Sequence, residues 1–230
     1  MSKPTCTCVI PFYNERKRIL SVLRVVTKIR SIDEIICVDD GSTDGTRQDI
    51  KKRYRNVRVI RLMKNQGKAQ AIKYGLMRAR GQYILLLDAD LSNLNENEIE
   101  RAIVKITKND KVDMIVLRRK YDPFISKIVR GDVLVSGERI VKKDDLERVF
   151  EGKVNGYQIE PAINYYMMDR KKSAFWMWHS GTNTNKLKKI GLMEGLTKES
   201  KLYMSIIAYK GPWKYIRSVS TFCLENLKDE

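Results

Sequence analysis

The sequence lacks any apolar run near the roughly 18 residues that a membrane-spanning helix needs, and its richest apolar segment, residues 83–87, is followed directly by an acid. It begins almost at once with a strand-like segment, which argues against a secretory signal. No stretch of Pro, Gly or Ser is long enough to form a linker or a disordered tail. We therefore expect a single domain over residues 1–230 in the cytoplasm, with a peripheral contact at the cytoplasmic membrane face as the alternative.

Histidine and cysteine are also scarce, with one and four residues respectively. Cys6 and Cys8 alternate along a predicted strand, and no second Cys or His pair at zinc spacing accompanies them. The cysteines are interpreted as buried thiols, which fits a cytoplasmic protein.

Acidic residues are in the minority, with 28 Asp and Glu against 45 Lys and Arg, for a net charge of +17. Such a field attracts phosphate, whether on nucleotide diphosphates, anionic lipid head groups or nucleic acid. A nucleic-acid-binding module would need basic residues interleaved with exposed aromatics or a recognisable motif. Neither is evident, so no nucleic acid is expected as a partner.

Apolar periodicity alternates between strand and helix through the first half of the chain, which predicts an open, mostly parallel α/β sheet flanked by helices. After residue 95 the pattern is looser, and the remainder beyond residue 178 is predicted to be mostly helical. The predicted strands are 5–10, ending at Pro11, then 34–38, 57–62, 83–87, 114–117, 134–141 and 174–178. The predicted helices are 15–29, 45–54, 68–79, 96–106, 144–150 and 160–169, and residues 118–130 form an irregular basic segment.

Polar clusters follow the first four predicted strands, at residues 11–15, 39–46, 65–68 and 88–90. In an open α/β sheet ligands bind beyond the carboxyl ends of the strands, so these clusters are predicted to converge on one edge. Asp88 and Asp90 suit Mg²⁺, which one or two carboxylates hold together with substrate phosphates. An acid at Asp39 or Asp40 can accept a hydrogen bond from a nucleobase or a ribose. The competing interpretation is a set of ordinary strand-to-helix turns.

The segments Val-Ile-Pro-Phe-Tyr-Asn-Glu at 9–15, Asp-Asp-Gly-Ser at 39–42, Asn-Gln-Gly-Lys at 65–68 and Asp-Ala-Asp-Leu-Ser at 88–92 resemble family 2 glycosyltransferases of the GT-A fold. The last run is similar to the branch that contains dolichyl-phosphate mannosyltransferases. The resemblance implies that residues 1–92 bind a nucleotide-sugar, that residues 93–230 bind the acceptor, and that the cofactor is Mg²⁺ or Mn²⁺ on Asp88 and Asp90. Several polyprenyl-phosphate enzymes carry Gln where this chain has Ser92, so that position stays open. The donor-binding residues that it implies are Pro11, Tyr13, Glu15, Asp39, Asp40, Gly67, Lys68, Asp88 and Ala89.

In the second half, residues 136–139 and 156–160 are similar to a segment of glucosyl-3-phosphoglycerate synthases. In those proteins the acid of a Gly-Tyr-x-x-Glu motif faces the donor sugar and the acceptor. Glu160 is therefore predicted to act with Asp90 in catalysis, as a general base or a sugar contact. The alternative is a helix-starting acid beside Pro161, which the helix dipole favours.

His179, which follows a predicted strand, would complete the metal site with Asp88 and Asp90, as a later His does in those synthases. A purely structural histidine is the alternative. Arg118, Arg119 and Arg139 are predicted to bind a phosphate of the acceptor, with plain surface charge as the competing account. The tail from Pro212 has apolar residues on one helical face, for packing, dimerisation or a membrane surface.

The predicted function is the metal-dependent transfer of a hexose from a UDP- or GDP-sugar to a polyprenyl phosphate or a small hydroxyl or phosphate acceptor. A nucleotidyltransferase is a second enzymatic possibility, but it would show a glycine-rich loop after the first strand, and residues 12–15 are not one. A non-catalytic basic protein that binds nucleotides or nucleic acid is the third. The stereochemistry and the oligomeric state stay open.

Overall fold

A seven-stranded sheet in the order β3-β2-β1-β4-β7-β6-β8 forms the centre of the molecule. The computed structural model describes residues 5–120, 131–183 and 211–227. The pairs are parallel except those that β7 makes with β4 and β6. The strands are β1 (Cys6–Phe12), β2 (Glu34–Asp39), β3 (Arg58–Arg61), β4 (Tyr83–Leu86), β6 (Met114–Arg119), β7 (Arg139–Lys142) and β8 (Ala174–His179).

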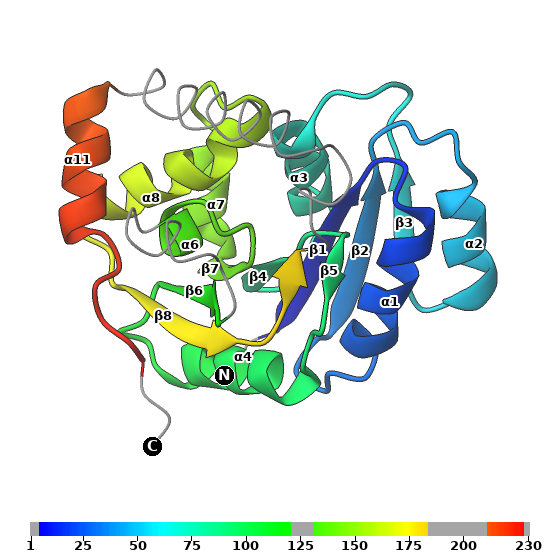
Figure 1. Ribbon diagram of the computed structural model, residues 1–230, viewed down its shortest axis with the longest axis horizontal. Coiled ribbons are helices and arrows are strands. Elements are labelled where there is room, and N and C mark those ends of the chain that lie inside the picture. The colour runs from blue at the N-terminus through cyan, green and yellow to red at the C-terminus, as the bar shows by residue number, and fades with distance from the viewer. Residues whose placement is uncertain (1–4, 121–130, 184–210, 228–230) are drawn as a thin grey trace.

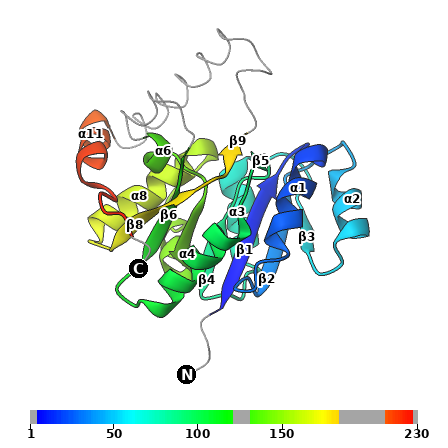
Figure 2. The same cartoon turned by 60° about the horizontal axis from the view of Figure 1, so that its bottom comes forward.

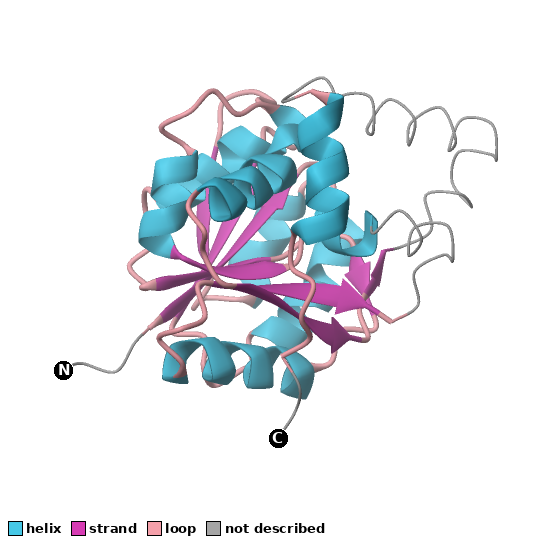
Figure 3. Cartoon of the chain, turned by 90° about the vertical axis from the view of Figure 1, so that its left-hand side faces the viewer, coloured by secondary structure: helices cyan, strands magenta, loops and turns pink. Residues whose placement is uncertain are grey.

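Helices cover both faces of this sheet (Figures 1 and 3), and an apolar core lies under each layer. The four cysteines are free thiols buried in these cores, which confirms their interpretation. Among the described residues, none of the helices has the length and apolar content to cross a bilayer. One layer holds α1 (Arg16–Val26), α2 (Thr46–Arg53) and α4 (Glu96–Lys108); the other holds α3 (Lys68–Leu76), α7 (Lys143–Val149) and α8 (Ile159–Asp169).

The predicted fold class is confirmed, and the strands and helices predicted in the first half all form, with shifted ends. β1 runs to Phe12 and does not stop at Pro11. The carbonyl oxygen of Val9 accepts from the amide of Leu87 on the β4 side. Alternate residues of a strand direct their backbone groups to the same side, so Pro11, two residues after Val9, also faces the β4 side. Because β4 ends at Leu86, the missing N–H of Pro11 removes no hydrogen bond between the two strands.

The second half departs further from the prediction. Residues 134–141 were predicted to be one strand, but α6 (Gly131–Leu134) precedes a turn, and only β7 is extended. Val133 and Leu134 are buried in the same core as α8 residues, and a short apolar run does not distinguish a strand from a helical turn. The two-stranded sheet of β5 (Leu91–Ser92) and β9 (Thr182–Asn183) was not predicted.

The basic segment and the tail are described only in part. Arg118 and Arg119 belong to β6, whereas residues 121–130 lie outside the described residues. Residues 184–210, predicted to be mostly helical, also lie outside them, and α11 (Pro212–Thr221) is a helix as expected.

Gly75 of α3 packs directly on the sheet, because an added Cβ would lie 2.6 Å from Cγ1 of Val9 and 3.1 Å from Cγ2 of Val38. Overpacking of this kind costs about 1–3 kcal/mol, against the gain of about 1 kcal/mol that Ala has over Gly in a helix. Gly75→Ala is therefore expected to lower the free energy of unfolding in urea. The control is Gly152→Ala, whose Cβ would lie 3.5 Å from the carbonyl oxygen of Val149. Equal stability of the two variants would contradict this packing.

Candidate functional site

The loops that follow β1 and β2 are tied together at the carboxyl edge of the sheet, the edge at which β5 and β9 also lie (Figure 2). The amide of Asn14 donates to Ser42 Oγ at 3.0 Å, and Asn14 Oδ1 accepts from the amide of Thr43 at 2.9 Å. Asn14 has a φ of 54°, a left-handed conformation in which Asn is enriched. Of the residues predicted here, Tyr13 is 46% exposed beside the loop, whereas Pro11 is buried in β1.

Asp40 ties the second loop to the third. Its two carboxylate oxygens accept from the amides of Gln66 and Gly67, each at 2.8 Å. Gly41, with a φ of 82°, lies so close that an added Cβ would be 2.8 Å from backbone atoms of Lys64 and Asn65. Asp40 was predicted to contact the donor; in this structure its carboxylate holds the loop before α3, and the donor contact stays a prediction.

Asp39 has an unsatisfied oxygen. The residue is 1% exposed, and its Oδ1 accepts from the amide of Ser42 at 2.7 Å. Its Oδ2 is buried and has no hydrogen-bond partner within the described part of the chain. Because a buried carboxylate oxygen without a donor is unfavourable, Asp39 is suited to accept an N–H or O–H from a ligand.

Lys68, at the start of α3, joins two carboxylates that are distant in the sequence. Its Nζ lies 2.5 Å from Asp88 Oδ1 and 2.8 Å from Glu160 Oε1. Burial alone would lower the pKa of Lys68, but the two carboxylates outweigh it and raise that pKa, so the side chain stays charged. Glu160 lies in the first turn of α8 and is 7% exposed. The structure thus brings together three residues that were predicted to share a site.

A loop before β7 closes over this ion pair. A Cβ added to Gly137 would lie 2.6 Å from Lys68 Nζ and 2.6 Å from Asp88 Oδ2. Gly67, with a φ of 88°, lies in ordinary contact with the 3₁₀ helix η1 (Gly156–Gln158), since its added Cβ would lie 3.7 Å from the Cα of Gly156. Glycine at 137 lets the second half of the chain come this close to the ion pair, and glycine at 67 allows the positive φ.

Asp90 faces a different cation. Arg18 lies 3.6 Å from Asp90 through Nη1 and 2.6 Å from Glu15 through Nη2. The side chains of Asp88 and Asp90 are 23% and 19% exposed, and Ala89 between them is buried. Over residues 5–120, 131–183 and 211–227, no three His, Cys, Asp or Glu side chains are grouped as a metal site. The hard oxygen donors nevertheless fit Mg²⁺ or Mn²⁺, and the ammonium of Lys68 is a stand-in cation at Asp88.

His179 ends β8 and is 1% exposed. Its Nδ1 accepts from the amide of Gly181 at 3.2 Å, and its Nε2 has no partner among the described residues. Burial, more than the surrounding charges, lowers the pKa of His179, so the imidazole is neutral, and with Nδ1 as the acceptor the ring proton is on Nε2. Because β9 pairs with β5, the chain after His179 lies beside the chain after Asp90. The metal-binding role of His179 stays a prediction.

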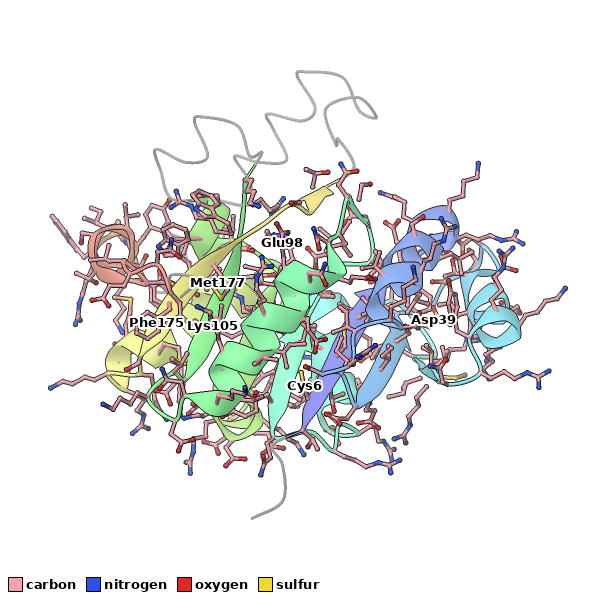
Figure 4. All side chains as sticks on the ribbon, turned by 90° about the horizontal axis from the view of Figure 1, so that it is seen from below. Cys6, Asp39, Glu98, Lys105, Phe175 and Met177 are labelled. Atoms are coloured by element: carbon pink, nitrogen blue, oxygen red, sulfur yellow. The ribbon has the colours of Figure 1, made fainter. Side chains whose placement is uncertain are left out.

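Glu98 fixes this segment, and no pattern in the sequence indicated it. The carboxylate accepts from the amide of Ser180 at 2.6 Å and from Lys120 Nζ at 2.6 Å. Burial would raise the pKa of Glu98, but the hydrogen bonds from Lys120 and Ser180 outweigh it and lower that pKa. Figure 4 shows Glu98 at the start of α4, where an acid is ordinary, so its role was not visible beforehand.

The three arginines predicted to bind the acceptor lie in different environments. Arg118 Nε lies 2.5 Å from Asp132 Oδ2, and its guanidinium carbon is 4.8 Å and 4.9 Å from the ring centroids of Trp176 and Trp178. Arg119 Nε lies 3.6 Å from Glu138 Oε2.

Arg139 differs from the prediction most clearly. It is fully buried, and its guanidinium donates to the carbonyl oxygen of Ser136 and, at 2.8 Å, to Asn164 Oδ1. In this structure it holds the interior of the second half together and does not reach a surface on which an acceptor could bind.

Comparison with known proteins identifies relatives of the chain. The model of Glycosyl transferase family 2 matches residues 7–174. A dolichyl-phosphate beta-glucosyltransferase of Dictyostelium discoideum is 35% identical over 118 residues, which cover 44% of this chain and 36% of that protein. The protein of the same name from Saccharomyces cerevisiae is 38% identical over 113 residues, which cover 44% and 34%. The matched part is thus about a third of these curated relatives.

Among solved structures, glucosyl-3-phosphoglycerate synthase from Mycobacterium tuberculosis has a similar fold. Its complex with Mn²⁺, UDP-glucose and phosphoglyceric acid superposes with a TM-score of 0.70 at 19% identity, and the match covers 89% of this chain and 79% of that one. At this level of identity the likeness concerns the fold.

Proposed function

The chain belongs to glycosyl transferase family 2, and from this we propose that it is a metal-dependent enzyme that transfers a hexosyl group from a nucleoside-diphosphate sugar to a polyprenyl phosphate. The observation that carries the proposal is the meeting of Asp88 and Glu160 on Lys68, with Asp90 two residues along. These acids lie at the carboxyl edge of the sheet, where open α/β folds bind their ligands.

For the donor we propose UDP-glucose, bound along the loops that follow β1 and β2. The Mycobacterium synthase was crystallised with UDP-glucose, and the two relatives are named glucosyltransferases. The buried Oδ2 of Asp39 is suited to accept an N–H or O–H of the nucleoside. Tyr13, exposed beside Asn14, would line the same pocket.

For the cofactor we propose Mg²⁺ or Mn²⁺, held by Asp88 and Asp90 with His179 as a third ligand. The cation would neutralise the charge that develops on the departing diphosphate. The carboxylate oxygens are chemically suited to this role, and His179 would bind the cation through Nε2 with its ring proton moved to Nδ1, in place of the bond from the amide of Gly181.

Glu160 would act on the sugar. During transfer an acceptor oxygen bonds to the anomeric carbon, while the bond from that carbon to the diphosphate oxygen breaks and its electron pair leaves with the diphosphate. A phosphate acceptor is already ionised, so with it Glu160 would orient sugar hydroxyls. A hydroxyl acceptor would instead need Glu160 to take its proton.

For the acceptor, the relatives named for dolichyl phosphate support a polyprenyl phosphate, because they are 35% and 38% identical whereas the synthase is 19% identical. A small phosphorylated hydroxyl compound is the alternative. Arg118 and Arg119, at the end of β6, would supply positive charge on the acceptor side, although Asp132 already holds Arg118.

A lipid acceptor also requires contact with a membrane, which we assign to α11. Trp213 and Ile216 are 81% and 55% exposed, and Arg217 lies on the same helical face. An exposed Trp with basic neighbours suits an anionic membrane surface, as does the net charge of +17.

Asp90→Ala tests the metal-dependent donor site. We expect the affinity for UDP in the presence of Mn²⁺, measured by calorimetry, to fall at least about tenfold, because even residues that only support metal ligands contribute this much. His179→Ala is expected to weaken the same affinity. The control is Asp110→Ala, an acid on the turn before β6. Unchanged Mn²⁺-dependent binding of UDP to a folded Asp90→Ala protein would rule out the proposed site.

Glu160→Gln tests the catalytic role at nearly constant side-chain size. Transfer from UDP-glucose to a polyprenyl phosphate is expected to slow by about 100-fold, the scale of a misplaced reacting group, because Glu160 would orient the sugar. The dissociation constant for UDP-glucose should change far less. If the transfer rate and the affinity for UDP-glucose fall by the same factor, Glu160 belongs to the binding of the donor and not to the reaction.

The double change Trp213→Ser and Ile216→Ser tests the membrane surface. Sedimentation with phosphatidylglycerol vesicles is expected to weaken at least about tenfold, because burying one such side chain contributes roughly 1.5–3 kcal/mol. Activity on a water-soluble short-chain acceptor should be retained. The control is Met77→Ser, which alters a side chain that is 67% exposed elsewhere. Equal vesicle binding by both variants would reject α11 as the contact.

A further inference from the structure

The space beside Asp88 already contains a positive charge. Lys68 Nζ lies 2.5 Å from Asp88 Oδ1, and the main chain at Gly137 leaves no room even for a methyl group over the pair. The side chains of Lys68 and Asp88 are only 21% and 23% exposed, so the pair is largely shielded from water. A divalent cation that binds Asp88 must therefore come to the carboxylate oxygens that Lys68 now neutralises.

The same ammonium neutralises Glu160, whose Oε1 lies 2.8 Å from it. With Lys68 left in place, a divalent cation on Asp88 would sit beside a like charge, which is unfavourable. If Lys68 moved away and nothing replaced it, Glu160 would lose its cationic partner. Glu160 is only 7% exposed, and a buried charge without a partner is unfavourable. Binding of the cation alone is disfavoured in either case.

We propose that Lys68 occupies the place of the divalent cation in the donor-free protein, so that the cation binds Asp88 only together with a nucleoside diphosphate. The diphosphate brings the negative charge that a displaced ammonium needs as a new partner. This inference rests on the proposed function. Lys68 is then a positioning residue that couples the two ligands, and each ligand must strengthen the binding of the other by the same factor.

The test is a titration with Mn²⁺, followed by the electron paramagnetic resonance signal of free Mn²⁺, without and with saturating UDP. In the wild-type protein UDP is expected to strengthen Mn²⁺ binding at least about tenfold, within the usual range of coupling between two ligands. Lys68→Met should bind Mn²⁺ without UDP about tenfold more tightly than the wild type, and its coupling to UDP should shrink.

Two further variants test whether the effect comes from the positive charge at position 68. Lys68→Arg keeps a positive charge and should bind Mn²⁺ alone as weakly as the wild type. Lys73→Met removes a lysine from the same helix α3, away from Asp88 and Glu160, and should leave every Mn²⁺ constant unchanged.

The wild-type measurement decides the matter even if Lys68→Met does not fold. Mn²⁺ affinity that is equal with and without UDP would overturn the inference, as would equal affinity of folded Lys68→Met and wild type for Mn²⁺ alone. If Mn²⁺ and UDP both bind but are not coupled, only this inference fails. If neither binds, alone or together, the proposed function fails as well.

Discussion

The contact of Lys68 with Asp88 and Glu160 is the interaction on which the rest of the site depends. It joins the end of β4, the start of α3 and the start of α8, and so it links the parallel first half of the sheet to the second half. Both acids are largely shielded from water, and the loss of one member of such a group costs more than the group contributes. The positions of these three elements are therefore fixed relative to each other by charge as well as by packing.

The same rule of paired charges extends around the sheet edge. Asp90 faces Arg18, Glu98 faces Lys120 and Arg118 faces Asp132. These acids are each matched by a nearby cation, whereas Asp40 is satisfied by backbone amides and Asp39 keeps one unpaired oxygen. An anionic ligand that enters would compete for those cations, and a metal ion would compete for those acids. Charged ligands of opposite sign are consequently accommodated best as a pair.

The first half of the fold was predictable because its signals are local. Each strand and helix of the parallel unit carries its own periodicity, and the carboxyl ends of parallel strands necessarily meet at one edge. The antiparallel β7 and the β5–β9 pair depend on contacts between distant segments, as does the bond from Ser180 to Glu98 across 82 residues. The neighbouring residues in the sequence do not distinguish Glu98 from any other acid in a first helical turn, and they do not distinguish Arg139 from a surface arginine.

Asp39 and Asp40 show why a motif alone does not assign roles. They are adjacent acids at the end of β2, both nearly buried, and the pattern treats them alike. Successive residues of a strand point to opposite sides, so the two carboxylates meet different neighbours. Both carboxylate oxygens of Asp40 accept hydrogen bonds from amides of the loop before α3. Asp39 accepts a hydrogen bond from one amide, and its other oxygen is buried without a partner among the described residues. Asp40 therefore stabilises the loop, whereas Asp39 keeps an acceptor oxygen that the described residues do not use.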